Sequence, residues 1–405
     1  MRYQSKKIGE IASVKGGKRL PKGMFVIDEP TPHPYLRIVD FADYGIDRTN
    51  IKYIDEEAFE KTKHYTIDKN DIYISIAGSI GRVGIVPDDL SGANLTENAA
   101  KITNISGDVD HRYLMYYLHG STGQGEITNR TGGTSQPKLA LYRIAAIDFP
   151  CPPLSIQTKT ADILSAYDNL IENNRRRIQL LEQAARLLYK EWFVRLRFPG
   201  HEHTKIINGV PVGWEKKKIA EVCETIGGGT PSTKVSEYWD GDITWVVPSD
   251  ITNNNSLILL KSERKITEKG LRESSAKLVP AETILMTSRA TVGYFALMDH
   301  EVCTNQGFIN IVPYDDQSRM YLLFNLLSRV NEIRSNAKGT TYPEISKGRF
   351  REMVIIIPGK TLINQFGEIA YDIIRQVRCL MRSNMSLTQA RDLLLPRLMN
   401  GEIAV

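Results

Sequence analysis

The sequence predicts an α+β fold, in which a mixed α/β domain occurs twice in tandem and a long α-helix follows each copy. Two observations lead to this expectation. Short segments recur in the same order in both halves of the 405-residue chain, and a helical segment of about 40 residues ends each half. A chain of this length suits two domains better than one core. The offset between copies, about 206–211 residues, is far too long for a solenoid repeat.

Four pairs of segments carry the repeat. They are KKIGEIASVKGGKR (6–19) with KKIAEVCETIGGGTP (217–231), DIYISIAGSIGRVGIV (71–86) with ETILMTSRATVGYFAL (282–297), LTENAAKIT (95–103) with CTNQGFINI (303–311), and GTSQPKL (133–139) with GTTYPEI (339–345). Within each copy, apolar runs such as DIYISIA and MVIIIP are bounded by Gly, Pro and Asn, which predicts strands. We therefore expect domains at 1–153 and 199–360, the latter opening with a linker at 199–214, and long helices at 154–198 and 361–405.

Both long helices have the 4-3 apolar spacing of a coiled-coil seam. The first seam comprises Ile163, Tyr167, Leu170, Asn174, Ile178, Leu181, Ala185, Leu188 and Trp192. The second comprises Phe366, Ala370, Ile373, Val377, Leu380, Leu387, Leu394 and Leu398, with Asn384 and Arg391 interrupting it. A helix of about 40 residues spans roughly 60 Å, too long to bury its stripe against one domain. The two helices are therefore expected to pair as an antiparallel coiled coil with pseudo-twofold symmetry.

An antiparallel pair in full overlap places residues opposite each other when their numbers add up to about 560. The numbers of Asn174 and Asn384 add up to 558. We predict that these two seam asparagines meet and fix the helix register, the alternative being that one or both face solvent.

Composition excludes several classes of protein. The hydrophobic fraction of 41% and charged fraction of 24% are those of a globular protein. No apolar stretch is long enough to span a bilayer and the N-terminus lacks a signal-peptide core, so a cytoplasmic location without membrane partners is expected. The net charge of +5 permits nucleic-acid binding without requiring it. The four cysteines lack CxxC spacing, which favours reduced structural thiols over a metal site.

The sequence contains no recognisable combination of catalytic residues. It has no dinucleotide or Walker phosphate-binding motif, no hydrolase or zinc-protease signature, no paired-carboxylate nuclease motif and no adenine-methylation tetrapeptide. We therefore expect no catalytic, cofactor-binding or metal-binding residues in this chain.

Polar and basic loops, by contrast, lie at corresponding places in both copies. Their side chains are the types that contact base edges and phosphates. The candidate DNA-binding residues are, in the first copy, Lys15, Lys18, Arg19, Lys22, Ser79, Arg82, Asn94, Thr96, Asn129, Arg130, Ser135, Gln136 and Lys138, and, in the second, Thr230, Ser232, Lys234, Ser288, Arg289, Asn305, Gln306, Lys338, Thr341, Tyr342 and Lys347. A shared scaffold with different loop residues is what two domains reading different short sequences would show.

These segments resemble the specificity subunit of type I restriction–modification enzymes. The resemblance is fullest in GGGTPSTKVSEYWDGDITWVVPSDI (227–251), LVPAETILMTSRATVG (278–293), CTNQGFINIV (303–312), GTTYPEIS (339–346) and the junction NGVPVGWEKKKI (208–219). The first copy departs from it in GGKRLPKG (16–23), where a Thr-Pro loop is usual, so this loop is expected to contact DNA differently.

The resemblance implies a DNA reader without its own catalytic site. Each domain would be a target-recognition domain for one half of a bipartite site in double-stranded DNA. The paired helices would set the gap and dock two methyltransferase (modification) subunits, which motor-nuclease (restriction) subunits then join. S-adenosylmethionine, ATP and Mg would be bound by those partners.

Three other functions remain open at this stage. The chain could serve a fused, type II-like restriction–modification enzyme. It could be a stand-alone methyltransferase or nuclease, which the missing cofactor motifs disfavour. It could also be an interaction scaffold that binds no DNA, its polar loops merely solvated.

Overall fold

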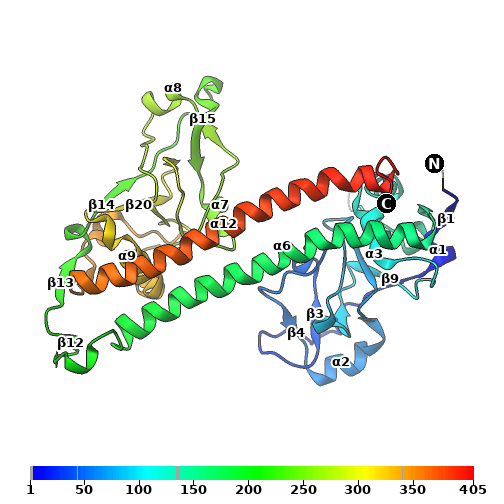
Figure 1. Ribbon diagram of the computed structural model, residues 1–405, viewed down its shortest axis with the longest axis horizontal. Coiled ribbons are helices and arrows are strands. Elements are labelled where there is room, and N and C mark those ends of the chain that lie inside the picture. Colours follow the sequence, from blue (N-terminus) through cyan, green and yellow to red (C-terminus); the bar gives the residue numbers. More distant parts are fainter. Residues whose placement is uncertain (1–2, 43, 134–136, 340) are drawn as a thin grey trace. The chain divides into compact units, whose positions relative to one another are not determined.

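The computed structural model describes residues 3–42, 44–133, 137–339 and 341–405. They form two compact units (Figure 1). The first unit combines the chain up to Ile171 with Ser386–Val405, and the second spans Glu172–Met385. The two long helices, α6 (Leu154–Tyr189) and α12 (Lys360–Met399), each contribute a segment to both units. Within the described ranges, no helix is both long and apolar enough to cross a membrane.

The first unit contains two four-stranded sheets and a two-stranded one. The antiparallel sheet has the order β2-β9-β6-β7, and the mixed sheet has the order β4-β3-β8-β5, in which β3 and β8 are parallel. The third sheet pairs β1 with β10. The strands are β1 (Ser5–Lys7), β2 (Ser13–Gly16), β3 (Pro34–Leu36), β4 (Lys52–Tyr53), β5 (Thr66–Ile67), β6 (Ile72–Ser75), β7 (Val83–Ile85), β8 (Ala93–Leu95), β9 (Ala99–Thr103) and β10 (Asp148–Pro150).

The second unit repeats this arrangement. Its antiparallel sheet has the order β14-β20-β17-β18, its mixed sheet has the order β16-β15-β19 with β15 and β19 parallel, and β13 pairs with β21. A hairpin, β11-β12, precedes them. The strands are β11 (Ile206–Ile207), β12 (Val210–Pro211), β13 (Glu215–Lys218), β14 (Cys223–Gly227), β15 (Trp239–Val246), β16 (Lys265–Ile266), β17 (Ile284–Thr287), β18 (Phe295–Ala296), β19 (Cys303–Thr304), β20 (Phe308–Pro313) and β21 (Val354–Ile357). The matching strand orders confirm the predicted fold class of two mixed α/β domains.

Short helices cover the sheets. Those of the first unit are α1 (Ile8–Ile11), α2 (Glu56–Thr62), α3 (His111–His119), α4 (Ser121–Arg130) and α5 (Leu141–Ala145). Those of the second are α7 (Pro248–Thr252), α8 (Glu268–Arg272), α9 (Arg319–Ser328), α10 (Val330–Ser335) and α11 (Lys347–Arg351). Asp110 caps the start of α3 by accepting from the backbone N–H groups of Arg112 and Tyr113, which are among the donors that a helix start leaves unpaired.

Both long helices begin directly after proline or glycine residues that disfavour continuation of the preceding strand. Pro152 and Pro153 precede α6, and Pro358 and Gly359 precede α12. A π-helical turn, Lys190–Val194, extends α6, and Leu196 follows it with a φ of 58°.

The two helices run antiparallel. In the second unit, Asn174 contacts Asn384 and, further along α6, Tyr189 packs edge-on against Phe366, nearer the start of α12. In the first unit, Asp168 contacts Arg391. All three pairs fit the antiparallel register expected from the sequence.

The predicted seam of α6 is correct in the second unit and wrong in the first. Asn174, Ile178 and Ala185 are buried as predicted, but Ile163 and Leu170 are 38% and 45% exposed. The buried apolar residues of the first part of α6 are instead Ala161, Leu164 and Ile171. Leu164 and Ile171 lie at seven-residue intervals from Ile178, so in this part of α6 the buried stripe lies one residue away from the predicted positions Ile163 and Leu170.

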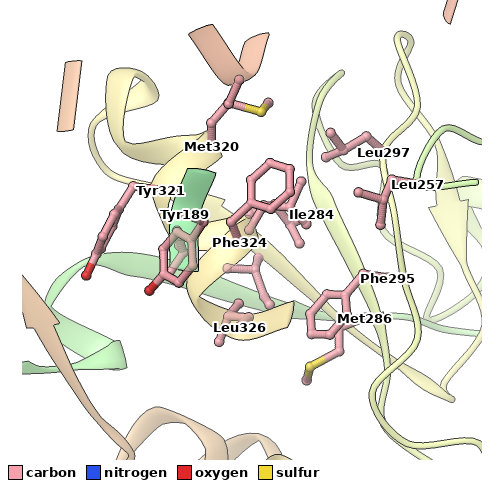
Figure 2. Close-up of a cluster of buried hydrophobic side chains, with 14 of the residues drawn as sticks. Tyr189, Leu257, Ile284, Met286, Phe295, Leu297, Met320, Tyr321, Phe324 and Leu326 are labelled. Carbon is pink, nitrogen blue, oxygen red and sulfur yellow. The ribbon is translucent and has the colours of Figure 1, made fainter. Parts of the chain in front are cut away.

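The long helices are part of each domain's core. In the second unit, Tyr189 of α6 lies beside Tyr321 and Phe324 of α9 (Figure 2). The same cluster continues to Ile284 of β17 and Phe295 of β18. In the first unit, Leu164 of α6 and Leu395 of α12 join the core of sheet β2-β9-β6-β7. Each domain is therefore packed onto the helix pair rather than tethered to it.

Candidate nucleic-acid interface

The loop after β2 and the loop after β14 have the same backbone construction. Gly17 and Gly228 lie so close to another strand that an added Cβ would be 2.1 Å from the Thr96 oxygen and 2.0 Å from the Asn305 oxygen, respectively. The next residue in each copy donates a backbone hydrogen bond to that strand, Lys18 to the Leu95 oxygen (2.9 Å) and Gly229 to the Thr304 oxygen (2.8 Å).

An aromatic side chain from a neighbouring strand donates a hydrogen bond to each of these loops. The Tyr35 hydroxyl donates to the Lys18 oxygen (3.0 Å), and the Trp245 indole Nε1 donates to the Gly229 oxygen (2.9 Å). Tyr35 and Trp245 occupy the same place, because they pair with Asn94 and Cys303 in the two parallel strand pairs. The loops 17–19 and 228–230 are therefore held by equivalent contacts.

Side chains then join this loop to the one after β8 or β19. In the first unit, Arg19 Nε donates to Glu97 Oε1 (2.6 Å). In the second unit, Thr230 Oγ1 donates to Gln306 Oε1. Arg19, Thr230 and Gln306 were predicted from the sequence, whereas Glu97 was missed because carboxylates are uncommon base or phosphate contacts.

A hydroxyl-capped turn forms the second repeated loop. Ser75 Oγ accepts from the Arg82 N–H (2.8 Å), and Thr287 Oγ1 accepts from the Tyr294 N–H (3.0 Å). The counterpart of Arg82 is therefore Tyr294, which is 41% exposed and was not predicted. Ser79 and Thr291 correspond as well, because their carbonyl oxygens accept from Ser75 Oγ and Thr287 Oγ1. The predicted contacts Ser288 and Arg289 therefore do not correspond to Ser79 and Arg82, since they lie three and five residues before Thr291 and Tyr294.

The loops GTSQPKL and GTTYPEI are each closed by a pair of backbone hydrogen bonds at equivalent positions. Gly132 and Lys138 exchange two backbone hydrogen bonds, as do Lys338 and Glu344. Arg289 reaches this second loop, with its Nε 3.3 Å from Glu344 Oε2. Ser135 and Gln136 lie outside the described residues.

Three of the predicted DNA-contact residues are buried, contrary to the expectation that they lie in open loops. Asn94 is 1% exposed, and its Nδ2 donates to the Thr62 oxygen (2.9 Å) and to Thr62 Oγ1 (3.0 Å). Thr96 is 6% exposed and bonds to Glu97, and Ser288 is 4% exposed. Asn94 lies within β8, and Thr96 and Ser288 directly follow β8 and β17, so these side chains present little polar surface to a ligand.

Arg130 is a weaker candidate than the sequence suggested. It forms ion pairs with Glu126 and, at 3.6 Å, with Asp148, and it donates to the Ala146 oxygen (3.1 Å). Arg82 keeps an exposed position, although its Nη1 donates to the Phe41 oxygen (2.9 Å).

The remaining candidates are accessible, and their role stays a prediction. Those that are exposed are Lys15, Lys18, Arg19, Lys22, Ser79, Arg82, Asn129, Lys138, Ser232, Lys234, Arg289, Gln306, Lys338, Thr341, Tyr342 and Lys347. Thr230 and Asn305 are half-buried.

Among the described residues, neither the potential metal ligands nor the cysteines indicate another functional site. In the part of the chain that the structure describes, no group of three His, Cys, Asp or Glu side chains could hold a metal ion. Burial raises the pKa of the Cys223 and Cys303 thiols to about 12 each, as expected for structural thiols. Cys379 is a free, exposed thiol.

Comparison with known proteins decides the family. The model of the type I restriction modification DNA specificity domain matches residues 2–183 and again residues 211–366, one match for each copy. This chain belongs to the family of type I restriction–modification specificity subunits. The resemblance stated from the sequence is thereby confirmed.

The similarity of this chain to individual specificity subunits differs in sequence identity and in the share of each chain covered. The chain is 38% identical over 169 residues to the type I restriction enzyme MjaIX specificity subunit of Methanocaldococcus jannaschii, a match covering 41% of this chain and 39% of that one. It is 25% identical over 402 residues to the HindI specificity subunit of Haemophilus influenzae, covering 83% and 87%. The fold is similar to that of the S subunit from M. genitalium, with a TM-score of 0.60, 17% identity and coverage of 98% and 96%.

Proposed function

We propose that this chain recognises a bipartite site in double-stranded DNA for a type I restriction–modification complex. Each target-recognition domain would read one half-site, and the α6–α12 pair would set the gap between them. The observation that carries this proposal is the loop cluster that occurs twice, with equivalent backbone contacts and different side chains. Equivalent scaffolds that present different polar groups suit two half-sites of different sequence.

The helix pair is suited to act as a spacer because each domain is packed onto it. Phe366 of α12 and Tyr189 of α6 are both buried in the core of the second unit. Leu164 of α6 and Leu395 of α12 are buried in the core of the first. Lengthening α6 by one turn would therefore move one domain along the helix axis by about 5.4 Å without altering its own reading loops.

The helix pair would also bind the modification subunits. Leu180 and Leu187 of α6 are 64% and 59% exposed, and their seven-residue spacing places them on one helix face. Large apolar side chains exposed together are typical of a protein–protein contact. Two modification subunits would bring S-adenosylmethionine, and motor-nuclease subunits would bring the ATP and Mg chemistry.

Selection of duplexes from a random pool tests the proposal. The full chain, assembled with its modification partner, should enrich two short motifs separated by a gap of constant length and indifferent sequence. Binding should weaken steeply with salt, because phosphate neutralisation releases counterions. A variant with four residues inserted into α6 should enrich the same motifs with a changed gap. Enrichment of one continuous motif, or of none, would argue against a bipartite reader.

A further inference from the structure

The strongest unexplained feature is the side-chain bridge that joins two loops at the same place in each domain. Arg19 and Thr230 are equivalent, since each lies two residues after the glycine that touches the neighbouring strand. Glu97 and Gln306 are equivalent as well, because Thr96 and Asn305, just before them, donate backbone hydrogen bonds to Leu36 and Val246 of the parallel partner strands. The bridge is ionic in the first domain and neutral in the second.

The geometry of the first bridge leaves a guanidinium edge free. Arg19 uses Nε to donate to Glu97, and its side chain is 79% exposed, whereas that of Glu97 is only 28% exposed. The two terminal nitrogens make no hydrogen bond among the contacts of the described residues. Two parallel N–H donors at the end of a fixed side chain match the O6 and N7 acceptors of guanine.

The contacts of Glu97 with Arg19 and Thr96 favour the ionised form of its carboxylate. Its partial burial alone would raise the pKa, but hydrogen bonds from Arg19 and Thr96 outweigh that effect and the pKa lies below its usual value. Each carboxylate oxygen has its own donor, Oε1 from Arg19 and Oε2 from Thr96 at 3.0 Å. A carboxylate held at both oxygens orients the arginine, so less side-chain entropy is lost when a base is bound.

The neutral bridge of the second domain offers a different set of hydrogen-bond donors and acceptors. Gln306 is exposed, and its Oε1 accepts from Thr230 Oγ1. That oxygen keeps a second lone pair, and Nε2 keeps its two donors. A side-chain amide with one acceptor and one donor facing outward matches N6 and N7 of adenine.

We propose that these two bridges are the equivalent base-reading pairs of the two domains, with Arg19, positioned by Glu97, reading a guanine and Gln306, positioned by Thr230, reading an adenine. This inference rests on the proposed function and adds to it a specific base at one position of each half-site.

The test is selection of random duplexes by the assembled complex carrying Arg19→Ala, Glu97→Gln or Gln306→Ala. Arg19→Ala should lose the preference for guanine at one base pair of the first half-site, on the order of 10- to 100-fold, and leave the second half-site intact. Glu97→Gln should lose part of that preference at the same base pair. Gln306→Ala should act in the same way on an adenine of the second half-site only.

Controls separate reading from general attraction and from misfolding. Lys22→Ala, an exposed charge in the same loop, should weaken binding to all sequences alike. The reciprocal double variant Thr230→Arg with Gln306→Glu should introduce a guanine preference into the second half-site, which a misfolded domain could not do. If Arg19→Ala lowered binding to all duplexes equally, Arg19 would be a phosphate contact and the inference would be wrong. If the unaltered complex enriched no motif, the proposed function itself would fail.

Discussion

Asn174 on α6 donates a hydrogen bond of 2.9 Å from its Nδ2 to Asn384 Oδ1 on α12. Asn174 is only 3% exposed, so its amide is buried between the two helices. Any slip of one helix along the other would leave a buried amide unpaired, at a cost of about 1–3 kcal/mol. The contact thus offers a physical reason for one register to be preferred.

Replacing these asparagines singly and together tests that role. Asn174→Leu should destabilise the protein by roughly 1–3 kcal/mol, because the hydrogen bond from Asn174 to Asn384 is lost. The double variant, Asn174→Leu with Asn384→Leu, should regain most of this stability while tolerating more than one register. Chemical unfolding measures the first effect, and the gap lengths of selected DNA sites measure the second. A double variant with a single, unchanged gap would remove the register role.

Arg391 provides a second polar contact across the helix pair, within the first unit. Its Nη1 lies 2.5 Å from Asp168 Oδ1, and its guanidinium lies 4.0 Å from the centre of the Tyr44 ring. The Arg391 side chain is 7% exposed, so Arg391→Met would leave Asp168 without its charge partner and should cost about 3–5 kcal/mol.

The matched control for Arg391 is an arginine of the same helix whose ion pair is exposed. Arg375 lies 3.1 Å from Asp372, with both side chains more than half exposed, and Arg375→Met should change stability by about 0–1 kcal/mol. Urea unfolding of both variants gives the comparison. Equal losses would mean that the buried position of Arg391 adds nothing.

Glu182 predicts a pH dependence of the second unit. This carboxylate of α6 accepts from Ser256 Oγ (2.6 Å) and the Leu257 N–H (2.8 Å), yet its burial raises its pKa above the usual value. The raised pKa favours the folded state fully below the unfolded pKa of about 4.5, and this contribution is lost as the pH rises through the folded pKa.

Glu182→Gln isolates that contribution, because an amide oxygen can accept the same two hydrogen bonds but carries no charge. The variant should gain stability relative to the natural protein as the pH rises above about 4.5. Urea unfolding midpoints of both proteins across this range supply the measurement. A stability difference that is the same at every pH would show that Glu182 does not change its protonation in this way.

The exposed apolar face of α6 predicts where the modification subunits bind. Leu187→Glu should weaken assembly with these subunits, since it places a charge in an apolar contact, and should leave the thermal stability of the free chain unchanged. Gln179→Glu adds the same charge to another exposed position of this helix and should have little effect. Titration followed by analytical ultracentrifugation distinguishes the two variants, and equal behaviour would place the contact elsewhere.

Much of the fold follows from pattern alone. The repeat predicted two equivalent domains, and the residue-number sum predicted that Asn174 would face Asn384. The seam of the first part of α6 was misplaced because Ile163 and Leu170 are apolar but exposed. Periodicity identifies apolar residues; it does not tell which of two neighbouring stripes faces the helix and which faces solvent.

The candidate interface was less predictable. Asn94 and Ser288 are residue types that are common in loops, yet tertiary packing buries them. A single sequence does not show which polar side chains become buried. Glu97 was missed for two reasons, since a carboxylate is an uncommon DNA contact and its partner, Arg19, lies 78 residues away in the chain. The repeat did not reveal it either, because the pairing of 95–103 with 303–311 placed Glu97 opposite Asn305, one residue before its structural counterpart Gln306.

The central claim is that this chain chooses the DNA sites of a type I restriction–modification complex through two separate half-sites. Mapping methylated adenines across the host genome, with and without the gene for this chain, tests it most directly. The account predicts one methylated motif of two specific parts separated by a gap of constant length, lost when the gene is removed. An unchanged methylation pattern after removal, or a lost motif without a gap, would contradict it.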